Sequence, residues 1–366
     1  MRGNADFSRN NLDCLRLILA AVVVLFHVDA LTNLPAFAAL GEYCSPHFAV
    51  RSFFVISGLL IYRSYLRSSS LKSYLSKRAR RIYPAYFTVV VVAAFGLFLL
   101  SADSASQYFG VGFWKYLGLN LLFLNFAAPS LPGVFNSNSL TAVDGALWTL
   151  KIEVAFYLFV PVMHFFCTRF GTKKTIGVIF FLSTLWKYGF EWLAYIYQAS
   201  GTGAAETTRS IYAKLAVQFP AQLAYFSAGV LLLLYFDKLK PHIRSIAIIT
   251  GCLYLADHMF ARGSLDVFWI SGIVIVFGFW HYFGNFSKYG DFSYGVYIVH
   301  WPILQVLILF GVARYNAALF LLLSLFFVGL ASLLLWYLVE RRFLATSSHY
   351  RRTSVEPPLV QHRTPV

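Results

Sequence analysis

The stretch LRLILAAVVVLFHV, from Leu15 to Val28, is apolar apart from Arg16 at its start and His27 near its end. It belongs to an apolar segment of the length that a helix needs to cross a bilayer, about 20 residues. Arg16 and His27 are eleven residues apart, so on a helix they share one face and lie about 16 Å apart along the axis. Asp13, three residues before Arg16, shares that face.

Ionisable groups near the middle of a membrane are costly and usually face a polar interior or a water-filled path. The stripe of Asp13, Arg16 and His27 has two interpretations. Either it lines a functional path, or Arg16 extends to lipid headgroups and His27 makes one structural hydrogen bond. This helix alone does not decide between them.

The composition places the whole chain in a membrane. Of its 366 residues, 59% are hydrophobic and only 12% are charged, whereas soluble domains are about half apolar and about a quarter charged. The net charge of +15 is typical of basic cytoplasmic loops and does not favour a nucleic-acid partner. The four cysteines show no metal-binding spacing, so we expect neither a zinc site nor a disulfide framework.

The apolar runs predict an all-α, polytopic membrane bundle of about ten transmembrane helices. The expected spans are 17–34, 47–66, 83–101, 147–167, 175–199, 215–236, 245–260, 267–284, 292–311 and 319–338. A shorter apolar run, 113–128, is expected to be re-entrant or interfacial. The loops then carry 20 Lys and Arg on the side of the N-terminus and 5 on the other, which predicts that both termini are cytoplasmic.

Other spans also contain polar residues. The second holds Arg51 and the pair Ser57-Gly58, where the glycine permits close helix packing or the approach of a ligand. The fourth holds Lys151 and Glu153, and the ninth places His300 near mid-depth. A lone histidine is usually structural, but two histidines, a glutamate and a Ser-Gly pair in one bundle favour a site.

The segment KRARRIYP, from Lys77 to Pro84, forms a dense basic cluster at the predicted cytoplasmic mouth of the third span. Such a cluster is an ordinary topology signal that meets anionic headgroups. It is equally suited to clamp a phosphate, because guanidinium groups bind phosphate in a bidentate way. Composition does not choose between the two.

Taken together, the motifs resemble membrane acyltransferase family three, the group of O-antigen and exopolysaccharide acetylases. Six segments carry the resemblance in family order across residues 12–343. Their matching residues are Asp13, Arg16 and His27; Phe53, Phe54, Ser57 and Gly58; Arg78, Arg81, Ile82 and Pro84; Trp148, Glu153, Phe156 and Tyr157; Ser293, Tyr294, Tyr297, His300 and Pro302; and Glu340. Many relatives carry an acidic residue where this chain has Arg51, which leaves the charge pairing of the second span open.

The resemblance implies a multi-pass protein of the bacterial inner membrane with an acyltransferase domain over 1–343, and we expect 344–366 to be a disordered cytoplasmic tail. It implies transfer of an acyl group, most often acetyl, from cytoplasmic acyl-CoA to a hydroxyl of an exported or cell-surface glycan such as O-antigen or exopolysaccharide. No metal is expected. The implied partners are acyl-CoA, a glycan or lipid-linked glycan and membrane lipids.

The resemblance implies that His27, Arg78 and Arg81 are functional residues, and the chemistry of the side chains suggests roles for these and the other candidates. We expect His27 to be the general base, since an imidazole pKa near 6.5 suits proton removal near neutral pH. Glu153 is expected to hydrogen-bond the sugar from near the outer end of its helix, and Ser57 to stabilise the oxyanion or, less favoured, to carry the acyl group. Arg78 and Arg81 are expected to bind the CoA phosphates, with Asp13 and Arg16 at the CoA end. The remaining candidates, with substrate-binding or structural roles, are His300, Tyr297, Tyr157 and Trp148.

Two other classes of function use similar residues. A transporter or flippase of a sugar or lipid-linked sugar would line its pathway with the same buried polar groups but release no CoA. A membrane acyltransferase that acts on lipids or proteins would keep the thioester donor and change the acceptor.

The charge count generates a topology prediction. In a background without the native cysteines, a membrane-impermeant thiol reagent added from outside should label Ser137→Cys and spare Ser70→Cys, because 102–146 is expected outside and 67–82 inside. The reverse labelling pattern would rule out the ten-span arrangement.

Overall fold

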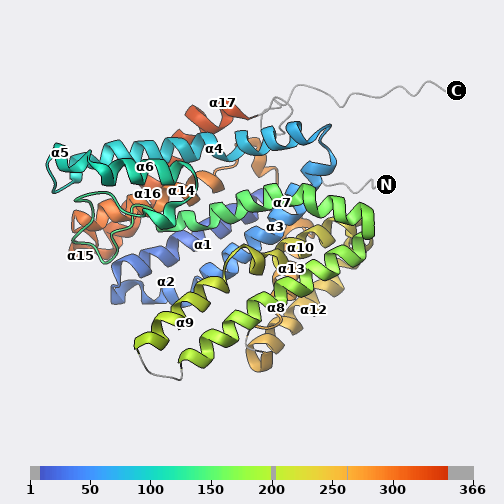
Figure 1. Ribbon diagram of the computed structural model, residues 1–366. Helices are drawn as coiled ribbons and strands as arrows, with labels where there is room; N and C mark the ends of the chain where they lie inside the picture. Colours follow the sequence, from blue (N-terminus) through green and yellow to red (C-terminus); the bar gives the residue numbers. More distant parts are fainter. Residues whose placement is uncertain (1–8, 199–202, 262, 345–366) are drawn as a thin grey trace.

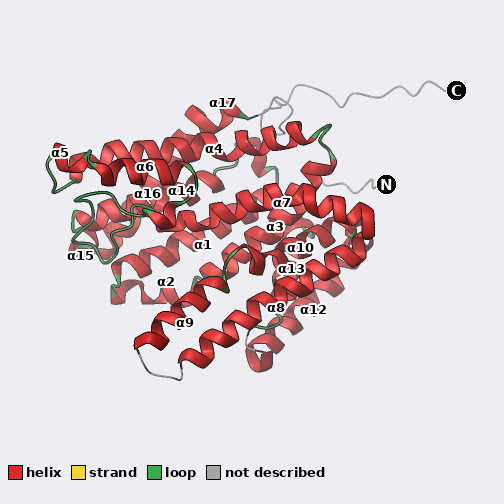
Figure 2. Ribbon diagram, in the orientation of Figure 1, coloured by secondary structure: helices red, strands yellow, loops and turns green. Residues whose placement is uncertain are grey.

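The structure, a computed structural model, describes residues 9–198, 203–261 and 263–344; the predicted tail over 344–366 lies almost wholly outside them. Within these residues the fold consists of helices joined by loops, with no strand (Figures 1 and 2). The ten longest membrane-type helices are α1 (Leu12–Thr32), α3 (Pro46–Leu66), α4 (Leu71–Gly96), α7 (Trp148–Phe170), α8 (Thr172–Gln198), α10 (Phe219–Leu234), α12 (Ile243–Ala256), α13 (Asp266–Phe279), α14 (Ser293–Leu309) and α16 (Ala317–Leu335).

Shorter helices connect or extend them. They are α2 (Ala38–Tyr43), α5 (Ala105–Tyr108), α6 (Val111–Leu121), α9 (Gly203–Leu215), α11 (Phe236–Leu239), α15 (Val312–Tyr315) and α17 (Arg341–Phe343). In Figure 1, α4 and α6 run along one side of the bundle, α8 and α12 along the other, and α1, α3 and α7 between them.

The expectation of an all-helical membrane protein is confirmed. Each expected span falls on one of the ten long helices. By length and composition, seven helical segments of the described chain suffice to cross a membrane, and α13 and α14 are apolar but shorter. The count of ten and the cytoplasmic position of the termini stay predictions.

The third span begins earlier than its hydropathy indicates. Helix α4 starts at Leu71, after Ser70 caps it by accepting a hydrogen bond from the backbone N–H of Ser73. Lys and Arg are good helix formers, so the basic cluster is helical although it is not apolar. Arg78 and Arg81 therefore project from the first three turns of α4, on the same rigid element as the membrane span.

The run 113–128 forms the short helix α6 and a following turn, packed against α4. The hydroxyl of Tyr86 donates to the carbonyl of Asn120 at 2.6 Å, and its ring stacks on Phe123 with centroids 4.2 Å apart. Helix α6 has 11 residues, which span about 16 Å, roughly half of a hydrocarbon core. It does not cross a membrane by itself.

Helices α3 and α10 touch backbone to backbone at two glycines. A Cβ atom on Gly58 would lie 2.0 Å from the carbonyl oxygen of Phe226, and one on Gly229 would lie 1.9 Å from the carbonyl oxygen of Val55. Small residues allow this close approach of membrane helices. The functional alternative for Gly58, approach of a ligand, is not needed to explain it.

This contact predicts which glycines tolerate alanine. Gly58→Ala and Gly229→Ala should each destabilise the purified protein by roughly 1–3 kcal/mol, because backbone atoms cannot move aside as a side chain can. Thermal unfolding in detergent measures this. The matched controls are Gly177→Ala in α8 and Gly329→Ala in α16, where an added Cβ meets nothing within 4 Å. A Gly58→Ala protein that melts with the controls would contradict the close contact.

Candidate functional site

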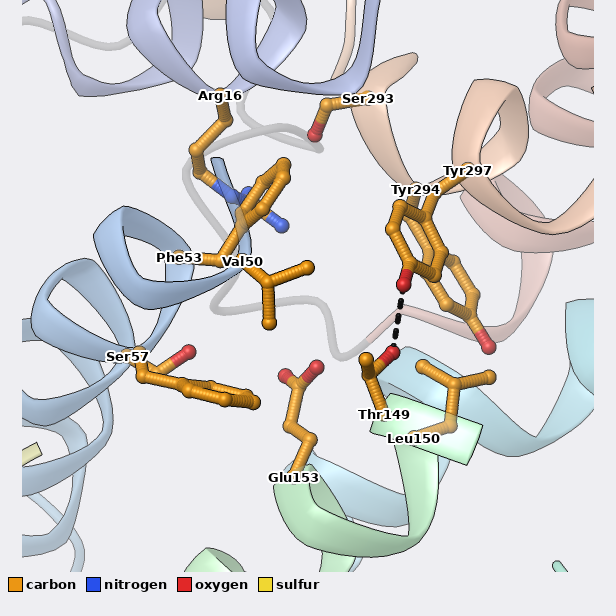
Figure 3. Close-up of a pocket in the computed structure, with 11 residues that line it drawn as sticks. Arg16, Val50, Phe53, Ser57, Thr149, Leu150, Glu153, Ser293, Tyr294 and Tyr297 are labelled. Atoms are coloured by element: carbon orange, nitrogen blue, oxygen red, sulfur yellow. Dashed lines mark hydrogen bonds between the residues drawn. The ribbon is translucent and has the colours of Figure 1, made fainter. Parts of the chain in front are cut away.

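A cavity of about 50 Å³ lies where α1, α3, α7 and α14 meet. Its walls carry charged, hydroxyl and aromatic side chains. Those that line it are Arg16, Val50, Phe53, Phe54, Ser57, Thr149, Leu150, Glu153, Ser293, Tyr294 and Tyr297. In Figure 3 the side chains of Arg16, Ser57 and Glu153 point into this space from three different helices.

A buried ion network adjoins the cavity, which two of its members, Arg16 and Ser293, line. Asp291, two residues before α14, accepts hydrogen bonds from the guanidinium groups of both Arg16 and Arg81. Its other oxygen accepts from Ser293, from the hydroxyl at 2.5 Å and from the backbone N–H at 3.2 Å. Arg81 also pairs with Glu340 at 2.9 Å, and the two carboxylate side chains are each only 1% exposed. Two cations thus face two anions.

The charge of Asp291 is stable in this setting. Burial by itself raises the pKa of a carboxyl group, but Arg16 and Arg81, with the Ser293 hydroxyl, outweigh burial and hold the pKa of Asp291 below its ordinary value. Asp291 therefore stays ionised at any pH at which the protein would work.

Arg78 differs from Arg81 although both belong to the basic cluster. Its Nη2 donates to the hydroxyl of Ser64 at 3.1 Å, and its guanidinium lies over the ring of Tyr157, 5.8 Å from the centroid. No carboxylate of the described chain pairs with it, and its buried Nε has no hydrogen-bond partner there. Arg78 is thus a cation that lacks the anions that Arg81 has.

The two mid-helix histidines lie against each other. Nδ1 of His27 is 2.9 Å from Nε2 of His300, and the rings are stacked with an interplanar angle of 15°. His300 is fully buried and His27 half-buried. The ring of Tyr297, which lines the cavity, contacts His300 with centroids 6.0 Å apart, so the pair lies beside the cavity wall.

Glu153 lies in the interior of the bundle, where it lines the cavity. Thr149, in the first turn of α7, shares a 2.7 Å hydrogen bond with the hydroxyl of Tyr297 in the second turn of α14 (Figure 3). Helix α7 thus starts next to the first turns of α14, and Glu153 shares the cavity with Arg16. The expectation that Glu153 lies near the outer end of its helix stays a prediction, and the structure adds that the start of α7 contacts α14 inside the bundle.

The hydroxyl of Tyr157 orients the carboxylate of Glu153, to which it donates a hydrogen bond at 2.6 Å. Tyr157 also lies below Arg78, so it connects the basic cluster to the cavity. Ser57 is half-buried on the α3 wall. Glu153 is a candidate base for Ser57, because both side chains line the same cavity. Sequence reasoning found no base for Ser57.

The structure brings together most of the residues expected to form a site. Four of them line the cavity, namely Arg16, Ser57, Glu153 and Tyr297, and His27, His300, Tyr157, Arg78 and Arg81 surround it. The remaining two are half-buried at helix starts, Asp13 in the first turn of α1 and Trp148 at the start of α7.

Sequence reasoning missed Asp291 and Thr149. Asp291 is one of only 15 acidic residues in the chain and lies two residues before Ser293, where the Ser-Tyr motif of α14 begins. An acidic residue among apolar spans usually has a partner or a function, so it carried a usable signal. Thr149 carried none, because a threonine in a helix usually bonds its own backbone.

The charge pairing of Arg51 is resolved by a second ion group away from the cavity. Its Nη1 lies 2.5 Å from Oδ2 of Asp266, which also pairs with Lys187 at 3.0 Å and accepts from the hydroxyl of Tyr225 at 2.7 Å. These residues join α3, α8, α10 and α13. The partner of the unusual cation in α3 is therefore an aspartate on another helix.

Comparisons with known proteins find similar sequences over most of the chain. The profile of a family described as an acyltransferase domain matches residues 9–341. An O-acetyl transferase of Shigella phage Sf6 is 27% identical over 358 residues, which cover 93% of this chain and 97% of the relative. Nodulation protein 10 of Rhizobium leguminosarum bv. viciae is 26% identical over 331 residues, 83% of this chain and 85% of the relative.

A further relative matches in part. The O-acetyltransferase OatA of Staphylococcus aureus is 29% identical over 191 residues, 48% of this chain and 28% of that protein. No solved structure matches the chain.

The ion network predicts a strong effect at Asp291. Asp291→Asn should lower stability by about 3–5 kcal/mol, because it leaves two buried guanidinium groups with one carboxylate between them. Thermal unfolding in detergent at neutral pH measures the loss, with exposed Asp237→Asn as the control.

The pH dependence has a definite sign. Since the pKa of Asp291 is lowered in the folded state, its contribution is complete above the ordinary aspartate pKa of about 3.9 and is lost only as the pH falls below it. If the difference in stability between the wild type and Asp291→Asn already disappeared as the pH fell from 7 to 5, the assignment would be contradicted.

Proposed function

The chain belongs to this acyltransferase family, and we propose that it is an integral membrane O-acetyltransferase that moves an acetyl group from cytoplasmic acetyl-CoA to a hydroxyl of an exported or cell-surface glycan. A bacterial inner membrane is the setting that fits this reaction. The whole-length similarity to the O-acetyl transferase of phage Sf6 supports acetyl as the group.

The observation that carries the proposal is the polar route through the bundle. It runs from Arg78 and the Arg16–Asp291–Arg81 network, past the cavity with Ser57 and Glu153, to the His27–His300 pair. Buried ionisable groups on helices are costly, and a continuous series of them is better explained by chemistry than by packing.

The donor phosphates belong at Arg78. The guanidinium of Arg81 is committed to Asp291 and Glu340, so its charge is already balanced. Arg78 has no such partner, and a guanidinium binds phosphate strongly. We therefore assign the direct phosphate contact to Arg78, while Arg81, with Arg16, holds the network that shapes the cytoplasmic mouth. Asp13, in the first turn of α1, supports the same end.

The thioester arm would then extend into the cavity. A cavity of about 50 Å³ holds a few water-sized groups, enough for the reacting end of the donor but not for a sugar. The sugar therefore stays outside the cavity, and only its reacting hydroxyl reaches His27 and the thioester. Ser57 donates a hydrogen bond to the developing oxyanion, and Glu153 polarises groups in the cavity.

The transfer step moves the acyl group from the sulfur of CoA to the oxygen of the acceptor hydroxyl. The acceptor oxygen attacks the thioester carbonyl, His27 takes the hydroxyl proton, the carbon–sulfur bond breaks, and the proton passes to the leaving CoA thiolate. A positioned imidazole is the most frequent general base for a proton transfer of this kind. A covalent route through Ser57 with Glu153 as its base is the second mechanism.

A transporter or flippase with the same polar route remains the alternative function. It would move its substrate without consuming acetyl-CoA. Release of free CoA by the purified protein, dependent on added glycan acceptor, separates the two functions.

The donor site predicts a difference between neighbouring arginines. Arg78→Ala should raise the KM for acetyl-CoA by about 10- to 150-fold, which corresponds to the roughly 1.5–3 kcal/mol of one charge-assisted hydrogen bond. The matched control is Arg80→Ala, exposed on the same helix, which should leave the KM within about twofold. If both substitutions changed the KM for acetyl-CoA equally, the basic cluster would serve only to set the membrane topology.

The base predicts a loss of rate without a loss of donor binding. His27→Ala should lower acetyl transfer by roughly 10²–10⁴-fold, with insertion and acetyl-CoA affinity unchanged, measured with labelled acetyl-CoA in membranes. Exposed His242→Ala serves as the control. Near-normal transfer by a well-expressed His27→Ala protein would move the base to His300 or Glu153.

A further inference from the structure

The contacts of His300 define where its proton sits. Its Nδ1 lies 2.7 Å from the carbonyl oxygen of Tyr297 and 3.2 Å from that of Val296. Carbonyl oxygens only accept hydrogen bonds, so Nδ1 must carry the hydrogen. A neutral imidazole has one N–H, which leaves Nε2 of His300 as a lone pair.

That lone pair in turn fixes the proton of His27. Nε2 of His300 lies 2.9 Å from Nδ1 of His27, so the hydrogen of this contact must come from His27. The neutral form of His27 is then protonated on Nδ1 and carries its lone pair on Nε2. Which ring nitrogen is basic is set by the hydrogen bond that the other one makes.

The reverse arrangement requires a second proton on His300. His300 is 0% exposed, and its polar contacts in the described chain are the two carbonyls and His27, with no carboxylate. A cation there would lack an anion, and an unpaired buried charge is costly. The neutral ring, which accepts from His27, is the form that fits this environment.

The position of His300 is itself firmly held. It lies in the middle of α14, and the ring of the adjacent Trp301 makes a T-shaped contact with His27, with 4.8 Å between centroids. The indole N–H of Trp301 donates to the carbonyl of Ala142 at 3.1 Å. Neither imidazole can rotate without breaking one of these contacts.

We propose that His300 is a positioning residue that holds His27 in the Nδ1–H tautomer, so that Nε2 of His27 is the nitrogen that takes the acceptor proton. This rests on the proposed function for the role of His27. When Nε2 gains the proton, the bond from Nδ1–H to His300 stays in place and stabilises the imidazolium. His300 thus takes the part that a carboxylate takes in a hydrolase triad, but with a neutral ring.

Two substitutions separate positioning from packing. His300→Phe fills the space but cannot accept a hydrogen bond, whereas the amide oxygen of His300→Gln can. His300→Phe should lower kcat by about 10²-fold, within the range that a general base contributes, with the KM for acetyl-CoA unchanged. His300→Gln should retain kcat within about tenfold of wild type. Equal activity of the two variants would overturn the proposal.

A spectroscopic readout tests the tautomer without any transfer reaction. In protein labelled with ¹⁵N-histidine in lipid bilayers, the His27 signals are those lost in His27→Ala. The wild type should show a protonated Nδ1 and an unprotonated Nε2, and His300→Phe should shift His27 toward the Nε2–H form. A wild-type His27 with its proton on Nε2 would overturn the proposal even if the variants were hard to produce.

The same experiments keep the two proposals apart. If His27→Ala were active while the wild-type spectrum showed the Nδ1–H tautomer, the assignment of the base would fail and the structural role of His300 would stand. If His27→Ala were inactive while His300→Phe kept full activity, the base would stand and the positioning role would fail.

Discussion

A carboxylate that is shielded from water needs its countercharges within reach, and the arrangement of this bundle follows from how Asp291 meets that need. Its partners come from α1 and α4, and through Arg81 the network extends to Glu340 beyond α16. Breaking such a buried pair costs several kcal/mol. The sliding of α1 and α14 past each other is therefore restricted at this end.

That restriction determines what happens further along the same two helices. His27 follows Arg16 by eleven residues, a rise of about 16 Å, and His300 follows Asp291 by nine residues, of which all but Phe292 lie in α14. Two parallel helices joined by an ion pair at one end thus bring their imidazoles level at the other. The ion pair and the histidine contact are two consequences of one helix register, and the cavity lies between them.

The sequence was sufficient to predict the helices and which residues share a helix face, but not which residues of different helices contact each other. Hydropathy located every long helix, and the spacing of Arg16 and His27 put both on one face of α1. The contact between His27 and His300 joins residues 273 positions apart, and periodicity within either helix says nothing about which helix lies opposite. Arg78 and Arg81 looked equivalent for the same reason, because the carboxylates that distinguish them come from distant segments.

The surroundings of Glu153 show a different limit of the sequence. Counting turns from the end of an apolar run assumes that the run starts at the membrane surface. Helix α7 starts instead beside the first turns of α14, where Thr149 meets Tyr297, because the residues before it turn inward. Depth in a membrane protein depends on neighbouring helices, and a single sequence does not report it.

The backbone contact at Gly58 and Gly229 has a mechanical consequence. Helices α3 and α10 are expected to move together, because their main chains touch and sliding one along the other would push a carbonyl oxygen into the neighbouring backbone. The α3 wall of the cavity, with Ser57, is therefore anchored to α10. The facing wall depends on side-chain contacts such as the one between Thr149 and Tyr297, which can break and re-form in thermal motion. If this narrow cavity widens, we therefore expect α7 to move while α3 keeps its place against α10.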